Sequence, residues 1–354
     1  MKKVIITGII IFIVGLVGAS FMVYNRMGLE EETPFKHEKM QNGSAIHNVK
    51  VVSNSVDMEI YPSTNNQIKA SFKGTKQENV TTDLQLTTNG DTVEIQAIRN
   101  ETSYRNWIHF DIGAIKQPTK VAVYLPKKQY NSLMLQTNNA DIQLSDYSGK
   151  TATANTKSGD IKLQNTDASL SVQTGHGDIH LTGAINLKAN NTITTSSGDI
   201  HMEFSNIQDP TKPLGESQLS LKSTQGDISL SGYQGKKLEA NTTNGDVTLQ
   251  NINTNFSVSS SNGDIHMQSI NNFHGQNQVN TSNGDINVAV GHDPKTLNVN
   301  FEGSNVQSDF PIQGNATSTN NEDNRELKGT IGTDSPNPPT LMMKTSFGDV
   351  SFSR

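Results

Sequence analysis

Aspartate could do the most chemistry in this sequence, because it recurs within one short phrase along most of the chain. The phrase is Thr or Ser, two variable residues, Gly-Asp, Ile or Val, a polar residue and an aliphatic one. Serial carboxylates bind Ca²⁺ in nonapeptide β-helix repeats, and a carboxylate pair hydrolyses glycosidic bonds. Nine copies of the phrase, the first with Ala in place of Gly, place an aspartate at Asp141, Asp160, Asp178, Asp199, Asp227, Asp246, Asp264, Asp285 and Asp349.

The spacing of the copies argues against both kinds of chemistry. Calcium-binding nonapeptide repeats have a period of about nine residues, with a preceding Gly-Gly. Here successive aspartates lie 18 to 28 residues apart up to Asp285, and each follows a single small residue. A catalytic pair would occupy one place and interrupt the pattern, whereas this aspartate is present in every copy. We therefore expect structural corner residues. The sequence predicts no enzyme, with no catalytic, cofactor-binding or metal-binding residues.

Three histidines occupy the second position after a motif aspartate, which the alternation places on the outer surface: His180, His201 and His266. His180 and His201 belong to consecutive units, so their imidazoles are expected about one strand spacing, ~4.8 Å, apart. Two stacked imidazoles could bind a metal ion if a third ligand joined them. Lys162 and Ser229 are the neighbours expected in that column, and neither is a suitable ligand. A solvent-facing row of side chains is the favoured interpretation.

The single tryptophan is Trp107, within an aromatic-rich segment at 103–110. Exposed aromatic side chains can anchor a binding partner, so the segment could be a contact patch. Packing within the N-terminal β region is the favoured alternative.

The elements that carry the motif aspartates are predicted to be short β-strands. Apolar and polar residues alternate, as in Ile161 and Leu163 against Lys162 and Gln164, which is typical of a strand with one buried face. Glycine permits the positive φ that a corner between two strands requires. The Thr or Ser four residues before the aspartate should stack into a ladder of hydroxyl groups formed by Thr156, Thr174, Thr195, Thr242, Ser260, Thr281 and Thr345.

A longer repeat is superimposed on the short one. Residues 141–204 align with residues 227–290 at an offset of 86, with 28 identities in 64 positions. Self-similarity at a period near 20 residues indicates a stacked repeat architecture. A β-solenoid with one unit per coil and a meander of antiparallel hairpins both fit, and Asn89-Gly90 is a hairpin signal. The solenoid is favoured, because every unit presents the same inward Ile-x-Leu face.

The chain is predicted to have four parts. Residues 129–354 form the all-β solenoid, and residues 45–128, which are less regular but strand-like, form an N-terminal β cap that covers its open edge. The phrase lapses between Asp285 and Asp349, where we expect a strand at 297–301 and a mobile polar loop at 315–325. Residues 25–44 form a tether, and residues 1–24 form a transmembrane anchor.

The anchor prediction rests on residues 4–24, which carry no charge. At ~1.5 Å per residue, a helix of this length matches the ~30 Å core of a bilayer. Lys2 and Lys3 precede the run, so the positive-inside rule places the N-terminus in the cytoplasm and the rest of the chain outside. A cleaved signal peptide ending near 18–20 is the alternative, but the apolar run continues past that point.

Composition excludes several classes of function. The formal net charge is −6, which disfavours nucleic acid as a partner because nucleic-acid binding requires a basic surface. The chain has no Cys, so it has no disulfide, thiol nucleophile or Cys-ligated zinc. Hydrophobic residues make up 32%, a low content that suits a stack of thin coils.

These features together resemble the putative-adhesin family of bacterial envelope proteins, which includes LiaG-like proteins and is related to the toast-rack β-repeat domains. The likeness covers about residues 45–354. It rests on the N-terminal anchor, the strand Val-Ala-Val-Tyr-Leu-Pro at 121–126, the serial Gly-Asp phrases and the closing segment at 329–350. The resemblance implies a fold and a place at the cell envelope, and it brings no catalytic residues.

The sequence therefore favours a single-pass membrane protein whose extracytoplasmic β-solenoid is a non-catalytic interaction surface in adhesion or envelope stress. Its expected partners are the membrane, through the N-terminal helix, and an envelope protein or cell-surface component. A structural spacer at the cell surface is the second interpretation. A carbohydrate-active β-helix enzyme is the third, and it would require an aromatic-lined cleft with a unique acidic pair.

Overall fold

The computed structural model describes residues 33–77, 79–101, 119–205, 216–313, 325–333 and 335–354. Its secondary structure is β-strand throughout this part of the chain, with no helix long and apolar enough to cross a membrane. The predicted anchor at 1–24, residues 25–32 of the predicted tether, Trp107 and most of the predicted loop at 315–325 lie outside the described residues. The tether prediction is wrong for residues 34–42, which form a β-strand that pairs along its whole length with residues 67–75.

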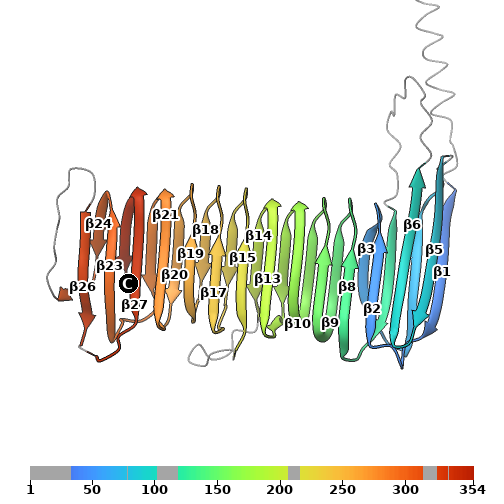
Figure 1. Cartoon of the computed structure of the whole chain (residues 1–354), viewed down its shortest axis with the longest axis horizontal. Coiled ribbons are helices and arrows are strands. Elements are labelled where there is room, and N and C mark those ends of the chain that lie inside the picture. The colour runs from blue at the N-terminus through green and yellow to red at the C-terminus, as the bar shows by residue number, and fades with distance from the viewer. Residues whose placement is uncertain (1–32, 78, 102–118, 206–215, 314–324, 334) are drawn as a thin grey trace, which may run out of the picture.

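Two layers of parallel strands lie one in front of the other along an elongated stack, with the apolar core between them (Figure 1). The entry sheet contains the strands that lead into each Gly-Asp corner, and the exit sheet contains the strands that leave it. β9 (Ile142–Asn155) and β10 (Ile161–His176) are long enough to pass from the exit sheet into the entry sheet. In the middle of the entry sheet lie β13 (Asn190–Ser197), β15 (Gln218–Lys222), β17 (Lys237–Asn241), β19 (Asn255–Ser259) and β21 (Gln276–Asn283).

The exit sheet is built in the same way from the residues that follow each motif aspartate. Its central strands are β11 (Ile179–Gly183), β14 (Ile200–Phe204), β16 (Ile228–Ser231), β18 (Val247–Gln250), β20 (Ile265–Ile270) and β22 (Ile286–Val290), while the two-residue β12 (Asn186–Leu187) pairs with β10 at the opposite edge.

Each strand pairs in parallel with the equivalent strand of the next coil. Ile161 is opposite Ile179, and Ile179 is opposite Ile200, so the motif positions stack in register. The coils at Asp285 and Asp349 are also neighbours, although 64 residues separate them in sequence. Parallel pairing between coils confirms the solenoid and excludes the hairpin meander for the repeat region. The alternation of buried and exposed residues follows, since a one-residue slip would turn the Ile-x-Leu face outward.

At the N-terminal end the order of strands in space departs from their order in the chain. The coil formed by β2 (Asn48–Ser53) and β3 (Asp57–Ser63) lies between the coil of β6 (Thr92–Glu101) and β7 (Lys120–Pro126) and that of β8 (Tyr130–Gln136) and β9. Parallel stacking therefore extends into the region predicted as a cap. Antiparallel strands complete this end, namely β5 (Val80–Asn89) on β6, β4 (Gln67–Thr75) on β7 and β1 (Pro34–Asn42) on β4.

At the C-terminal end, too, the order of strands in space departs from their order in the chain. This arrangement explains why the Gly-Asp phrase is absent between Asp285 and Asp349. The last coil in sequence, β27 (Thr340–Phe347) and β28 (Asp349–Ser353), lies between the β21–β22 coil and the earlier coil of β23 (Thr296–Gly303) and β24 (Asn305–Ser308). β26 (Arg325–Gly332) adds antiparallel to β23, and β25 (Ile312–Gln313) adds to β26. β23 contains the predicted strand at 297–301.

Aromatic side chains close the two ends of the apolar core. Phe35 meets Phe72 edge to face, with ring centroids 5.1 Å apart, at the N-terminal end. Phe301 and Phe310 both pack on Phe352 at the other end, at 5.5 and 5.1 Å. Large rings cover the open end of a stack better than short aliphatic side chains do. Between the ends, the inward Ile, Val, Leu and Met side chains form one continuous core.

Candidate functional site

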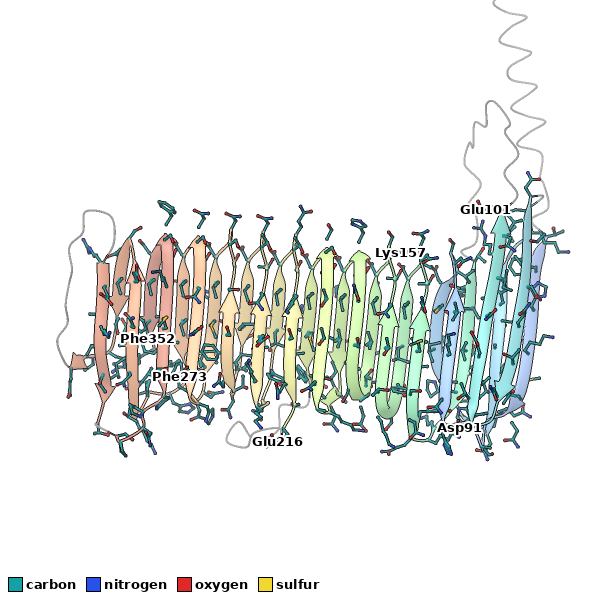
Figure 2. All side chains as sticks on the ribbon, viewed as in Figure 1. Asp91, Glu101, Lys157, Glu216, Phe273 and Phe352 are labelled. Atoms are coloured by element: carbon teal, nitrogen blue, oxygen red, sulfur yellow. The ribbon has the colours of Figure 1, made fainter. Side chains whose placement is uncertain are left out.

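The Gly-Asp corners form one long edge of the stack, the corner edge. Figure 2 shows Lys157 on this edge and Glu216 on the opposite edge. The motif glycines have φ between +142° and +157°, a region that side-chain-bearing residues rarely adopt, which confirms the predicted corner role of Gly159, Gly177, Gly198, Gly226, Gly245, Gly263, Gly284 and Gly348.

The predicted hydroxyl ladder is confirmed next to the corners. Thr174 Oγ1 donates to the carbonyl oxygen of Gly159 at 2.9 Å, and Thr195 Oγ1 donates to that of Gly177 at 3.1 Å. Ser223 continues the ladder by donating to Gly198, although it was not among the residues predicted for it. The Thr or Ser of each coil is buried, so the ladder satisfies hydroxyl groups that would otherwise lack a partner.

The motif aspartates form a second ladder on the corner edge. One carboxylate oxygen of each aspartate accepts a hydrogen bond from the backbone N–H of the next, at 2.8 to 3.1 Å. Asp57 begins this row, and burial raises the pKa of its carboxyl group. The sequence argument missed Asp57 because its copy has Val56 in place of the glycine. Every motif carboxylate that accepts such a bond thus has the same structural task, as the repetition predicted.

This ladder makes a prediction with an internal control. Asp246→Ala removes the acceptor for the Asp264 N–H, so the free energy of unfolding should fall by ~1.5–3 kcal/mol, the usual range for a bond to a charged group. Asp349 ends the row and accepts no such bond from a described residue, so Asp349→Ala should cost clearly less. Denaturant melts of both variants measure the difference. An equal loss in the two variants would contradict the ladder as the source of stability.

His180 and His201 occupy equivalent positions of consecutive coils as predicted, but their rings lie farther apart than the expected strand spacing. His180 and His201 are register partners on β11 and β14, and their ring centroids are 6.1 Å apart at an angle of 50°. Lys162 and Ser229 flank them in the same row, and His266 lies two coils beyond Ser229. Within the described ranges no cluster of three or more His, Asp or Glu side chains is arranged to hold a metal ion.

A hollow of about 730 Å³ on the outer face of the exit sheet is the most distinctive surface feature, and we call it the tyrosine hollow. It spans five adjacent strands, β4, β7, β3, β9 and β10. Tyr61 and Tyr124 are register partners whose rings lie 5.8 Å apart, tilted by 32°. The side chains that complete its lining are Glu59, Pro62, Ser71, Lys73, Lys120, Ala122, Gln143, Ser145, Asp146 and Gln164.

The rows of side chains across these strands explain its shape. Ser71 is opposite Ala122, and these two small residues form the floor. Tyr124 and Tyr61 stand on one side of the floor, in the same row as Lys69, and Lys73 and Lys120 stand on the other side. A smaller hollow of about 260 Å³ shares Ser71, Lys73 and Tyr124 with the first and extends over β4 to β1.

Charged groups around the tyrosine hollow are mostly paired. Lys120 Nζ lies 2.9 Å from Glu59 Oε1, and the bond raises the pKa of Lys120. Lys69 and Lys36 both contact Glu38 at 2.9 Å, and hydrogen bonds from the two ammonium groups lower the pKa of Glu38 to about 2. These pairs are solvent-exposed and contribute little to stability, but they fix where charge is presented.

A third hollow, of about 530 Å³, opens at the edge opposite the corners, and we call it the edge hollow. Tyr130 and Tyr147 stack beside it, with ring centroids 6.1 Å apart. Both phenols are buried and donate to backbone carbonyls, Tyr130 to Pro126 and Tyr147 to Thr151. Because these groups are engaged in the fold, the tyrosine hollow offers more polar groups to a ligand.

Comparison with known proteins places the chain in a family. The family model described as Toastrack DUF4097 matches residues 46–209 and again residues 165–353. The chain therefore belongs to the Toastrack family, and the resemblance derived from its motifs is confirmed at that level. The two overlapping matches agree with the internal duplication. No curated protein matches the chain.

The comparison with solved structures finds similar chains at low sequence identity. A putative cell adhesion protein from Clostridium sporogenes is 12% identical, with 91% of this chain and 99% of that chain covered and a TM-score of 0.26. A putative adhesin from Bacteroides fragilis is 10% identical, with 92% and 98% covered and a TM-score of 0.35. A putative lipid binding protein from Parabacteroides distasonis is 12% identical, with 90% and 97% covered and a TM-score of 0.36.

Proposed function

We propose that this Toastrack protein is anchored in the membrane by residues 4–24 and exposes its β-solenoid outside the cytoplasm as a non-catalytic recognition surface. Adhesion and the response to cell-envelope stress are the processes in which we place it. The observation that carries the proposal is the tyrosine hollow, a concave site with an aromatic pair and polar groups on a rigid sheet. Such a concave arrangement is typical of ligand sites.

The ladders support a recognition role because they keep the surface fixed. Each coil is tied to its neighbours by backbone pairing, a buried hydroxyl and a motif carboxylate. Side chains on a rigid element lose less conformational freedom when a partner binds, so more of the contact energy appears as affinity. The same rigidity favours a second candidate, a structural spacer that carries the hollow away from the membrane.

The proposal is tested on intact cells in two steps. Protease added to wall-stripped cells should digest the solenoid and leave a short membrane-bound fragment, because the N-terminus is cytoplasmic in this topology. Survival of the full-length chain in cells that remain intact would contradict the proposed location. Lysed cells are the control for cleavage.

The second step asks whether the hollow meets a partner. A photo-reactive residue in place of Gln143 in the tyrosine hollow should give specific adducts on illuminated cells. The same residue in place of Ser220, on the outer face of β15, is the matched control and should give none. Adducts at neither position would favour the spacer, and equal adducts at both would indicate non-specific contact.

A further inference from the structure

Ser71 is an unusual residue for the outer face of a sheet, because it is buried. It is 2% exposed, and its hydroxyl oxygen has no hydrogen-bond partner within the described structure. Ser71 lines both the tyrosine hollow and the smaller hollow beside it. A buried hydroxyl without a partner costs free energy, so its position at the floor of a hollow suggests that a ligand completes its hydrogen bonding.

Lysines flank this hydroxyl along its own strand, while its register partners on the two neighbouring strands are Glu38 and Ala122. Lys69 and Lys73 stand two residues before and after Ser71 on the same face of β4. Their long flexible side chains can move aside without disturbing the backbone. A ligand that draws the ammonium groups toward itself would therefore also uncover the hydroxyl.

Three of the lysines form a row across adjacent strands. Lys36 on β1 is opposite Lys73 on β4, and Lys73 is opposite Lys120 on β7. The outer two pair with Glu38 and Glu59, whereas Lys73 has no ion-pair partner among the described residues. Because no carboxylate offsets its charge, Lys73 is the lysine of this row that attracts an anionic group most strongly. The anion that fits must therefore reach the centre of the row.

The tyrosine pair supplies the other half of the recognition. The faces of Tyr61 and Tyr124 are electron-rich, and they suit a ring that presents slightly positive C–H groups. A pyranose ring has such a face, and its hydroxyl groups need donors and acceptors around its rim. Gln143, Gln164 and Ser71 provide amide and hydroxyl groups at the hollow.

We infer that the tyrosine hollow binds a saccharide that carries an anionic group, with the sugar ring on Tyr61 and Tyr124, its carboxylate or phosphate at Lys73, and a hydroxyl group at Ser71. This inference rests on the proposed recognition function and names its ligand class. Lysine contacts to an anion and aromatic contacts to an apolar face act together, so neutral sugars and small anions should bind more weakly than acidic saccharides.

The test uses the full chain in detergent micelles on an array that displays uronic-acid, sugar-phosphate and neutral oligosaccharides. Binding to acidic spots, and little to neutral ones, is the expected result. The two acidic classes distinguish a carboxylate from a phosphate ligand.

Lys73→Glu and Tyr124→Ala should each lower the affinity for the acidic saccharide about tenfold or more, the scale of a lost charge-assisted contact or aromatic anchor. Lys222→Glu on the entry sheet is the matched charge control and should change it less than about twofold.

Ser71→Ala separates recognition from folding. Because its hydroxyl has no partner in the protein, the melting temperature should stay the same or rise, while affinity for the acidic saccharide falls about three- to tenfold. A fall in stability with unchanged affinity would overturn the role of Ser71. Binding to no spot, equal binding to neutral sugars, or binding unaffected by Lys73→Glu would overturn the saccharide inference.

Vesicles with and without phosphatidylglycerol form the last arm. Binding to the anionic vesicles that disappears in Lys73→Glu, with no binding on the array, would assign the hollow to a lipid headgroup and overturn the inference. If photo-adducts form at position 143 in cells while the array stays silent, the recognition function stands and the saccharide class alone fails. If neither gives a signal, both fail.

Discussion

Gly198→Val is expected to be the most damaging single substitution at the corner edge, with a loss of more than about 4 kcal/mol in the free energy of unfolding. Gly198 has φ of +142°, and a Cβ atom there would overlap the carbonyl group of Gly177 in the preceding coil. A β-branched residue adds strain at such a φ. Neither cost can be relieved locally, because the carbonyl belongs to a backbone held on both sides by parallel pairing.

In Gly198→Val, the coils next to the altered corner should unfold before the rest of the stack does. Each coil contacts only its neighbours, so the stack can open at the altered corner while distant coils persist. Hydrogen exchange should therefore show lost protection in β11 and β14, next to the corner, and less change in β20 and β22. Uniform protection with an unchanged melting temperature would contradict the proposed geometry.

Gly90→Asn is the matched control for Gly198→Val. Gly90 also has a positive φ, +61°, but a Cβ atom there would meet nothing within 4 Å. Asparagine tolerates that left-handed conformation. The change should cost less than about 1 kcal/mol, which would show that a positive φ alone does not make a glycine irreplaceable in this fold.

The repeat itself could be predicted from the sequence because its rules are local. Alternation placed Ile161 and Leu163 in the core, the glycine fixed the corner, and the residue four before the aspartate fixed the hydroxyl ladder. Each of these depends on a few consecutive residues whose physical roles repeat. The parallel register followed from them, since only one alignment of neighbouring coils buries every Ile-x-Leu pair.

The ends of the stack and the tyrosine hollow could not be predicted in the same way. Asp57 belongs to the aspartate row, but its coil lacks the glycine that marks the others. Tyr61 and Tyr124 lie 63 residues apart in the sequence, and they meet only because the β2–β3 coil inserts between later strands. The hollow depends on that long-range order of strands, which local periodicity does not encode. Ser71 offered no signal at all, because its position in an alternating strand predicts exposure.

The second large loss of stability is expected in the duplicated segments, where Tyr147 and Tyr233 occupy equivalent positions 86 residues apart. Their surroundings in the fold differ. Tyr233 is fully buried, packs against Phe204 at 5.8 Å and donates to the Ser217 carbonyl at 2.9 Å. Burial raises the pKa of Tyr233 to about 12, so the phenol remains a hydrogen-bond donor at neutral pH. Tyr147 is buried but borders the edge hollow, which already admits solvent.

Tyr233→Ala should therefore cost about 4–5 kcal/mol, because it leaves an enclosed cavity and an unpaired carbonyl, whereas Tyr147→Ala should cost about 2–3 kcal/mol. Water can enter the space left by Tyr147 through the existing opening and replace part of the lost contact. Tyr233→Phe, which keeps the ring, should cost about 1–2 kcal/mol and isolates the hydroxyl contribution. Denaturant melts of the three variants measure these losses. Equal losses for the two alanine variants would mean that water in the edge hollow does not offset the removal of the Tyr147 ring. The two tyrosines would then contribute equally to the free energy of unfolding.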